Sequence, residues 1–223
     1  MKVEESLVKR AAVHAALGEP VRLAIAETLS LGDASPSALG ARLELASNLL
    51  AHHLAVLEAA GLVRRSRSDA DRRRSYVCLT ELAYPWVALP PIGEVARVVF
   101  VCTRNSARSQ LAAALWANRS RVPVASAGTE PADDVDPRAL AAVRRQRLKL
   151  RRARTAHVAD VLQPDDLVVS VCDRAYERLT RSRPVGLHWS VPDPARGGGA
   201  TAFDRALSTL RGRVSRLAEA IPG

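Results

Sequence analysis

The chain has little of several residue types that often define a function. It holds three cysteines among 223 residues, and aromatic side chains make up 4%. Three cysteines cannot form the dense disulfide framework of a small secreted domain, and an odd number suits a reducing compartment. Because neither a Cys-x-x-Cys pair nor clustered Cys and His residues occur, we predict no metal site.

Long hydrophobic runs are also missing from the sequence. No apolar stretch approaches the roughly 18–20 residues that span a bilayer, and residues 1–20 carry acidic side chains without the apolar core of a secretion signal. We therefore expect a cytoplasmic protein with no membrane partner. Hydrophobic residues still make up 48%, enough for a packed core, and the net charge of +10 favours anionic partners.

The character of the sequence changes near Pro90, Pro91 and Gly93, which are typical of a short linker. Short helical patterns and a basic strand pair precede this point, and apolar strands alternating with helical stretches follow it. We predict two domains, residues 1–91 and 92–223. The first is mainly helical with a β wing, and the second is an α/β domain with a small parallel sheet.

Closely spaced helix signals mark the first half. Pro20 and Pro36 fit first helical positions, and Ser35 and Ser47 fit the capping positions before two helices. The helix after Ser47 buries leucines with i, i+4, i+7 spacing, and Gly61 ends it. A basic hairpin, "LVRRSRS" and "RRSYVCLT" around the turn "DADR", completes the pattern of a winged helix-turn-helix.

A winged helix-turn-helix binds duplex DNA. Its third helix enters the major groove with its N-terminal residues at the base edges, and the wing arginines neutralise phosphates. The residues expected to contact DNA are Ser47, Asn48, Ala51, His52, Arg64, Arg65, Arg67, Arg72, Arg73 and Arg74.

Residues 8–85 resemble the ArsR family of bacterial repressors. The resemblance rests on "ALGEPVRLAIAETL", "SNLLAHHLAVLEAAGLVRR" and "RRRSYVCLT". It implies a homodimer, built partly on the first helix, that binds a palindromic operator. Many members sense metal or arsenite through a cysteine pair in the helix before the recognition helix. Here that helix reads "SPSALGARL", without cysteine, and we expect the lone Cys78 to lie in the core.

The second half opens with "VVFVCTRNSARSQLAAAL", an apolar strand, a polar loop and a helix. In open α/β sheets, ligands bind where strands end and helices begin. We expect the backbone of the loop Thr103, Arg104, Asn105, Ser106 and Ala107, together with Arg108, to cradle an oxyanion. The helix dipole and Arg108 both favour a thiolate at Cys102. The Cys-x5-Arg spacing therefore supplies a nucleophile and a guanidinium for bidentate contact.

A candidate general acid lies far along the chain, in "HWSVPDPAR". Pro194 stiffens the loop around Asp193, whose carboxyl group could protonate a leaving oxygen.

Residues 96–223 resemble the low-molecular-weight protein tyrosine phosphatases and their arsenate reductase branch. The matching motifs are "VCTRNSARSQ", "ASAGTEP", "DLVVSVCDRAYERL" and "VPDPA". The resemblance implies Cys102 as the nucleophile, Arg108 as the oxyanion clamp and Asp193 as the acid. It also implies Ser109 as a stabiliser of the thiolate and Asn105 as the residue that holds the loop.

Three departures from this family bear on the substrate. Arg104 replaces a common glycine, so the backbone there must tolerate a side chain, whose charge could add to the anion field. Ala107 replaces the second loop cysteine of the phosphatases. Ala195 and Arg196 stand where tyrosine phosphatases tend to carry aromatic residues. The last two departures favour a small inorganic oxyanion over phosphotyrosine.

The favoured reading is arsenate reduction. Cys102 attacks arsenate, Asp193 helps water to leave, and a second thiol attacks Cys102 and releases arsenite. Cys172 is the intramolecular candidate for that thiol, or else a packed strand-end cysteine. Thioredoxin-linked reductases use a third cysteine that this domain lacks. We therefore expect no bound cofactor and an external reductant such as mycothiol, glutathione or a redoxin.

The sequence thus predicts a DNA-binding regulator fused to an arsenate reductase-like domain, with a role in arsenic resistance. Two alternatives stay open. One is a phosphatase of phosphotyrosine or small phosphoesters fused to the same regulator. The other is a repressor without enzymatic activity whose cradle senses arsenate or phosphate.

Overall fold

The structure is a computed structural model that describes residues 4–149, 153–182, 185–196 and 199–222. The chain divides into two compact units. The first comprises Met1–Arg67 and Arg73–Pro90, and the second comprises Ser68–Arg72 and Pro91–Gly223. The short turn Ser68–Arg72 thus groups with the second unit, although it lies far from the rest of that unit in the sequence. In the described part of the chain, no helix is long and apolar enough to cross a membrane.

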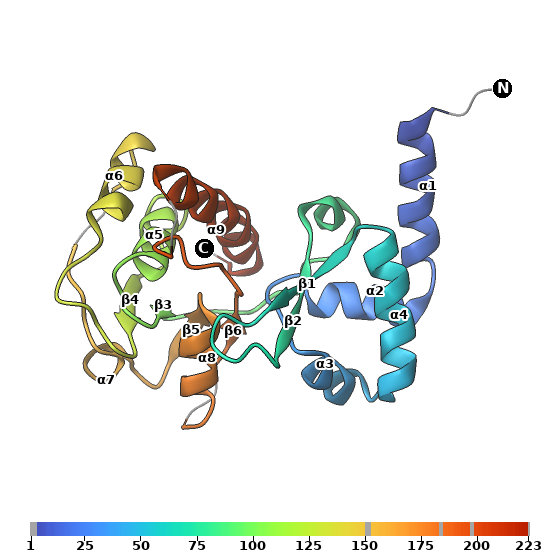
Figure 1. Cartoon of the computed structure of the whole chain (residues 1–223), viewed down its shortest axis with the longest axis horizontal. Coiled ribbons are helices and arrows are strands. Elements are labelled where there is room, and N and C mark those ends of the chain that lie inside the picture. Colours follow the sequence, from blue (N-terminus) through green and yellow to red (C-terminus); the bar gives the residue numbers. More distant parts are fainter. Residues whose placement is uncertain (1–3, 150–152, 183–184, 197–198, 223) are drawn as a thin grey trace. The chain divides into compact units, whose positions relative to one another are not determined.

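Four helices build the first unit, and proline and capping residues mark the starts of two of them (Figure 1). They are α1 (Glu5–Leu17), α2 (Pro20–Thr28), α3 (Pro36–Leu43) and α4 (Ser47–Ala59). The first residues of α2 and α3 are the predicted prolines, and Ser35 Oγ accepts a hydrogen bond of 3.2 Å from the Ala38 amide. These expectations are confirmed.

The expected cap of α4 is wrong by one residue. Ala46 holds the extended capping conformation, and Ser47 is the first residue of the helix, with no side-chain cap present. The physical reason is that a serine near a helix start is equally compatible with the first helical turn, so its identity alone does not fix the boundary. The leucine stripe is confirmed, because Leu50, Leu54 and Leu57 are buried. Gly61 follows the helix with a φ of 71°, a left-handed conformation that suits glycine.

The wing of the first unit is a two-stranded antiparallel ribbon. β1 (Val63–Arg67) pairs with β2 (Ser75–Leu79), and an isolated bridge joins Ala34 to Val77 on the other side of β2. A 3-10 helix, η1 (Glu81–Trp86), follows. Cys78 on β2 is fully buried, as the sequence predicts.

The second unit is built on a four-stranded parallel sheet in the order β4-β3-β5-β6. The strands are β3 (Arg97–Cys102), β4 (Val124–Gly128), β5 (Asp166–Ser170) and β6 (Leu187–His188). Every residue of β3 after Arg97 is buried, which explains its continuous apolar run. The expected α/β fold with a small parallel sheet is confirmed.

Helices cover this sheet on both sides. They are α5 (Arg108–Ala117), α6 (Pro137–Arg145), α7 (Val158–Val161), α8 (Asp173–Leu179) and α9 (Ala200–Ala220). α5, α6 and α9 pack against one another, and α8 packs against β3 and β5 (Figure 1). Phe100 on β3 lies between the rings of Trp116 and Trp189, with centroid distances of 6.2 and 5.7 Å. This packing fixes the carboxyl edge of the sheet, where the site lies.

Candidate functional site

The site is built on the loop between β3 and α5. Cys102 is the last residue of β3 and Arg108 the first of α5, so the intervening residues cross the carboxyl edge of the sheet. A cavity of about 460 Å³ opens there, and Cys102, Arg108, Cys172 and Asp193 all line it. The structure therefore brings together four residues from three separate segments of the sequence.

A directed series of hydrogen bonds ends on the sulfur of Cys102. The amide of Ala156 donates to Asn105 Oδ1 at 2.9 Å, which fixes the orientation of the Asn105 side chain. Asn105 Nδ2 therefore faces Ser109 Oγ, 2.9 Å away, and donates to it. The Ser109 hydroxyl is left to donate to Cys102 Sγ at 3.1 Å. Such a donor stabilises a thiolate more than a thiol.

The backbone of Asn105 has a left-handed conformation, with a φ of 50°, and its side chain is fully buried. In this conformation its amide turns inward and donates to Cys102 Sγ at 3.2 Å. The close approach of the loop to β4 requires glycine at position 128, because a Cβ there would lie 2.8 Å from the carbonyl oxygen of Thr103.

Arg108 is 7% exposed, and its guanidinium is held from two directions. Its Nη1 donates to the carbonyl of Val191 at 2.9 Å, and its Nη2 lies 3.2 Å from Asp193 Oδ2. Burial alone lowers the pKa of this guanidinium, but the charges of Cys172, Cys102 and the nearby carboxylates outweigh burial and raise the pKa. Arg108 therefore keeps its positive charge beside both thiols.

Asp193 lies across the cavity from the cysteine loop. Its side chain is 24% exposed, and its Oδ1 accepts a hydrogen bond of 3.1 Å from the amide of Ala195. This bond to the backbone fixes the carboxylate on the cavity side of the loop. The position suits a group that donates a proton to an oxygen leaving from an anion bound at Arg108.

Cys172 comes after β5 and caps the start of α8, where its Sγ accepts from the Ala175 amide at 3.4 Å. Its sulfur lies 3.4 Å from Thr103 Oγ1, so the cysteine loop contacts this second thiol directly. Burial raises the pKa of the Cys172 thiol, against the opposing effect of Arg108. Two thiols thus share one cavity and one guanidinium, and burial favours the protonated form of Cys172.

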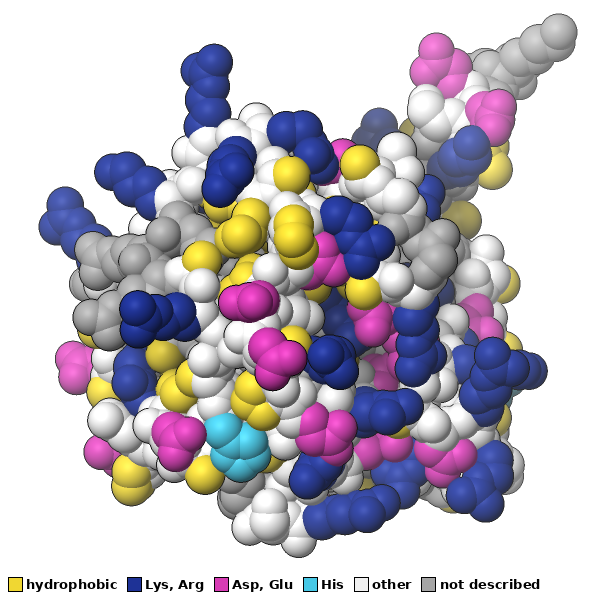
Figure 2. Space-filling model, turned by 60° about the vertical axis from the view of Figure 1, so that its left-hand side comes forward, with side chains coloured by type: hydrophobic (Ala, Val, Ile, Leu, Met, Phe, Trp, Pro, Cys, Tyr) yellow, Lys and Arg dark blue, Asp and Glu magenta, His cyan; other side chains and the backbone are white. Residues whose placement is uncertain are grey.

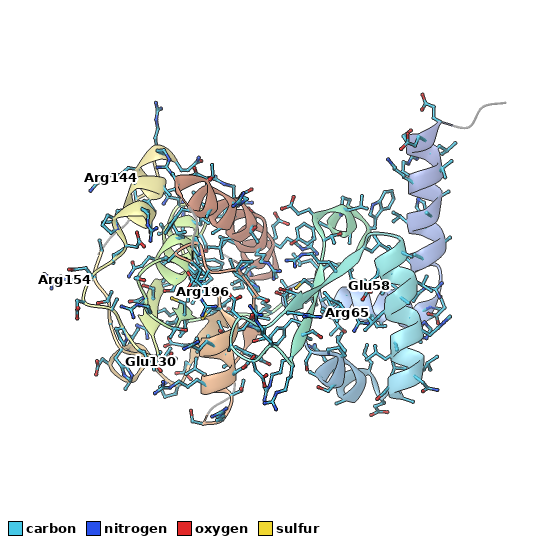
Figure 3. All side chains as sticks on the ribbon, viewed as in Figure 1. Glu58, Arg65, Glu130, Arg144, Arg154 and Arg196 are labelled. Atoms are coloured by element: carbon cyan, nitrogen blue, oxygen red, sulfur yellow. The ribbon has the colours of Figure 1, made fainter. Side chains whose placement is uncertain are left out.

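Charged side chains surround the mouth of the cavity. Arg104 is exposed and lines the cavity, as do Glu130, Arg174 and Arg196 (Figure 3 labels Glu130 and Arg196). Figure 2 shows Lys and Arg side chains spread among Asp and Glu side chains over one face of the molecule. None of the described residues that line the cavity is aromatic. The remaining predicted loop residues, Ser106 and Ala107, also line it.

The four predicted contact residues of α4 all lie on its exposed side: Ser47, Asn48, Ala51 and His52. The neighbouring His53 is buried, with its Nδ1 3.5 Å from a carboxylate oxygen of Glu19, so the two histidines point in different directions.

The six predicted arginines of the hairpin are exposed: Arg64, Arg65, Arg67, Arg72, Arg73 and Arg74. Arg65 points toward Glu58 on α4, with 2.6 Å between Arg65 Nε and Glu58 Oε1 (Figure 3). Its guanidinium is therefore partly neutralised within the domain.

Sequence reasoning missed three groups of the site. The Ala156 amide and the Val191 carbonyl are backbone groups, which carry no side-chain signal. Asp69 also lines the cavity, with its Oδ2 3.8 Å from Arg108 Nη1. It lies 39 residues before Arg108 in the sequence, in the polar turn of the basic hairpin. Nothing in the local pattern pairs it with the cysteine loop.

Comparisons with known proteins agree with this arrangement. Residues 97–222 match the family model for low molecular weight phosphotyrosine protein phosphatase, and residues 17–66 match a helix-turn-helix domain model of the ArsR type. Arsenate reductase 1 of Bacillus cereus is 32% identical over 128 residues, which cover 55% of this chain and 93% of that protein. An arsenate reductase of Bacillus licheniformis is 31% identical over 137 residues, with 55% and 94% covered.

A solved structure supports the fold of the second unit. The crystal structure of a tyrosine phosphatase from Erwinia amylovora matches with a TM-score of 0.51 at 19% identity, and the match covers 58% of this chain and 95% of that one.

Proposed function

The chain belongs to the low molecular weight phosphotyrosine protein phosphatase family, and we propose that its second unit is a thiol-dependent arsenate reductase joined to a DNA-binding repressor module. One observation carries the proposal. Two thiols, Cys102 and Cys172, line the same oxyanion cavity beside the buried guanidinium of Arg108. A phosphatase needs one of these thiols, whereas a reductase needs two electrons and can take them from the pair.

In the first step, the Cys102 thiolate attacks the arsenic atom of arsenate. A bond forms between Cys102 Sγ and arsenic, and an oxygen leaves as water after Asp193 gives it a proton. Arg108 and the amides of the loop hold the remaining oxygens in place. The hydroxyl of Ser109 lies 3.1 Å from Cys102 Sγ, within reach to donate a hydrogen bond to the attacking sulfur.

In the second step, the Cys172 thiolate attacks Cys102 Sγ. A disulfide bond forms, the bond between sulfur and arsenic breaks, and its electron pair stays on arsenic, which is released as arsenite. The contact of 3.4 Å between Cys172 Sγ and Thr103 Oγ1 supports this role, because it places the second thiol against the loop that carries the first.

An external thiol then restores the enzyme. Two thiol groups of mycothiol, glutathione or a redoxin reduce the disulfide and become a disulfide themselves. The charged mouth of the cavity suits small polar thiols such as mycothiol and glutathione. No bound cofactor is needed for this cycle.

The first unit supplies the proposed control of an arsenic-resistance operon. We infer a homodimer that binds a palindromic operator, with the start of α4 in the major groove and the hairpin arginines on phosphates. Exposed apolar side chains on α1, Leu7 at 49% and Val8 at 55%, support a partner surface along that helix.

Two rivals remain testable, and one observation bears on each. Phosphotyrosine hydrolysis usually benefits from aromatic side chains that stack on the substrate ring, and the described lining of this cavity has none. A repressor that only senses oxyanions would not need a positioned acid or a second thiol, and the cavity contains both Asp193 and Cys172.

The test compares two reactions of the purified full-length chain. Arsenite release is measured with mycothiol, glutathione or a glutaredoxin system, and hydrolysis is measured with an aryl phosphate. We expect arsenite release that disappears in Cys102→Ser. Hydrolysis without arsenite release would establish the phosphatase instead, and loss of neither reaction in Cys102→Ser would show that the site lies elsewhere.

A further inference from the structure

The turn Ser68–Arg72 lies against the oxyanion cavity, although the sequence places it in the middle of the basic hairpin. We propose that this turn occupies part of the cavity and that the carboxylate of Asp69 competes with a substrate oxyanion for Arg108. Binding of an oxyanion would then displace the turn. The proposal rests on the anion-binding character of the cavity and goes beyond arsenate reduction.

Ser68 anchors the turn. It is 2% exposed, and its hydroxyl donates a hydrogen bond of 2.7 Å to Glu177 Oε1 on α8. Ser68 Oγ also accepts hydrogen bonds from the amides of Ala70 and Asp71, at 3.0 and 3.2 Å. One buried side chain therefore shapes the turn and attaches it to α8.

A second anchor involves Asp173, the first residue of α8. The Asp69 amide donates to Asp173 Oδ2 at 2.9 Å. Asp173 is itself buried, and its Oδ1 lies 3.0 Å from Nε2 of the buried His188. The contact with His188 thus holds the Asp173 carboxylate, which accepts from the Asp69 amide, in place.

The two anchors direct the Asp69 side chain into the cavity. Its Oδ2 lies 3.8 Å from Arg108 Nη1, while Asp193 Oδ2 lies 3.2 Å from Arg108 Nη2. Two carboxylates therefore share the guanidinium that should clamp the oxyanion. A doubly charged oxyanion at Arg108 would meet the repulsion of Asp69, whose charge has the same sign.

Chain connectivity carries the displacement to the hairpin. Arg67 ends β1 immediately before the turn, and Arg72 is its last residue. Both are expected to contact DNA phosphates, and both depend on the path of the chain through the turn. Coupling of this kind is reciprocal, so an oxyanion that releases the turn changes the affinity for DNA, and DNA changes the affinity for the oxyanion. It would also give a repressor without a cysteine pair in α3 a means of sensing.

The first test measures the binding of inorganic phosphate to the full-length chain by calorimetry. Removing the competing charge in Asp69→Asn should tighten phosphate binding by about tenfold. The matched control is Asp71→Asn, which removes the same charge from the same turn without lining the cavity, and it should change the affinity by about twofold or less. Equal effects of the two variants would overturn the proposal.

The second test needs no variant. Hydrogen exchange of the Asp69 amide, which is bonded to Asp173, is followed in the wild-type chain with and without phosphate. Saturating phosphate should speed this exchange by about tenfold or more, while the amides of β3 stay protected. Unchanged or slower exchange of Asp69 would overturn the proposal. Neither measurement depends on turnover, so a chain that fails to reduce arsenate can still pass both.

Discussion

Ser109 Oγ lies 3.1 Å from Cys102 Sγ and accepts a hydrogen bond from Asn105 Nδ2 at 2.9 Å. Because Asn105 Nδ2 donates to Ser109 Oγ, the Ser109 hydroxyl hydrogen points away from Asn105 and can be donated to Cys102 Sγ. The nucleophile thus depends on a hydrogen bond whose direction is set by the Ala156 amide, outside the cysteine loop.

The first prediction concerns this donor. Ser109→Ala removes the hydroxyl that lies 3.1 Å from Cys102 Sγ, and a hydrogen bond to a thiolate is worth about 1.5–3 kcal/mol. The rate of alkylation of Cys102 by iodoacetamide at neutral pH should fall roughly 10- to 100-fold. Ser106→Ala makes the same change in the loop that precedes α5 and keeps the backbone amide, so it should alter the rate by less than about threefold. A similar loss in both variants would contradict the assigned donor.

The second prediction concerns pH and Cys172. Because burial raises the pKa of this thiol, it is largely protonated at neutral pH, and attack on Cys102 should accelerate as the pH rises. Formation of the disulfide after addition of arsenate should therefore be several-fold faster at about pH 9 than at about pH 7. Cys172→Ser should abolish disulfide formation, whereas Cys78→Ser, at a fully buried position of the first unit, should leave it intact. A rate that is independent of pH would argue against Cys172 as the attacking thiol.

The third prediction compares how much each arginine of β1 contributes to the salt dependence of DNA binding. Each phosphate contact contributes about 0.9 to the slope of log affinity against log salt for duplex DNA. Arg64→Ala and Arg67→Ala should each reduce that slope by about 1.8, because the proposed homodimer loses one contact in each protomer. Arg65→Ala should reduce it less, because Arg65 Nε lies 2.6 Å from Glu58 Oε1. Fluorescence anisotropy over a range of salt concentrations measures the slopes, and three equal losses would show that the ion pair does not matter.

The fourth prediction concerns stability at the far end of β3. Nε and Nη2 of Arg97 donate two hydrogen bonds of 2.7 Å to the carboxylate of Asp166, whose side chain is 2% exposed. Arg97→Met removes the guanidinium that neutralises a buried carboxylate and should lower the free energy of unfolding by about 3–5 kcal/mol. Urea unfolding followed by the fluorescence of Trp116 and Trp189 measures the loss.

Arg97→Lys is the control for that measurement. It keeps the positive charge but loses the paired geometry, so its cost should be smaller than that of Arg97→Met. A loss below about 1 kcal/mol in Arg97→Met would mean that water or another side chain replaces the guanidinium.

Local features of the sequence predicted much of this molecule. Pro20 and Pro36 fixed two helix starts, and the spacing from Cys102 to Arg108 fixed the strand, loop and helix around the cradle, because all of these depend on residues close in the chain. The capping serine of α4 was misplaced by one residue, since Ser47 suits the first helical position as well as the cap.

The rest of the site depends on tertiary structure. The Ala156 amide and the Val191 carbonyl reach the cradle from loops far away in the sequence, and any residue type could have supplied them. Asp69 reaches the cavity because hydrogen bonds attach its turn to Glu177 and Asp173 on α8. Neither the sequence of the turn nor that of α8 reveals this contact alone.

The central claim is that Cys102 and Cys172 together supply the two electrons that reduce arsenate. The most direct measurement is a single turnover, in which the fully reduced chain is mixed with arsenate in the absence of any other thiol. We predict about one arsenite per chain, a disulfide between Cys102 and Cys172 in the peptide map, and a free thiol at Cys78. If no arsenite appears and all three cysteines remain reduced, the claim is wrong.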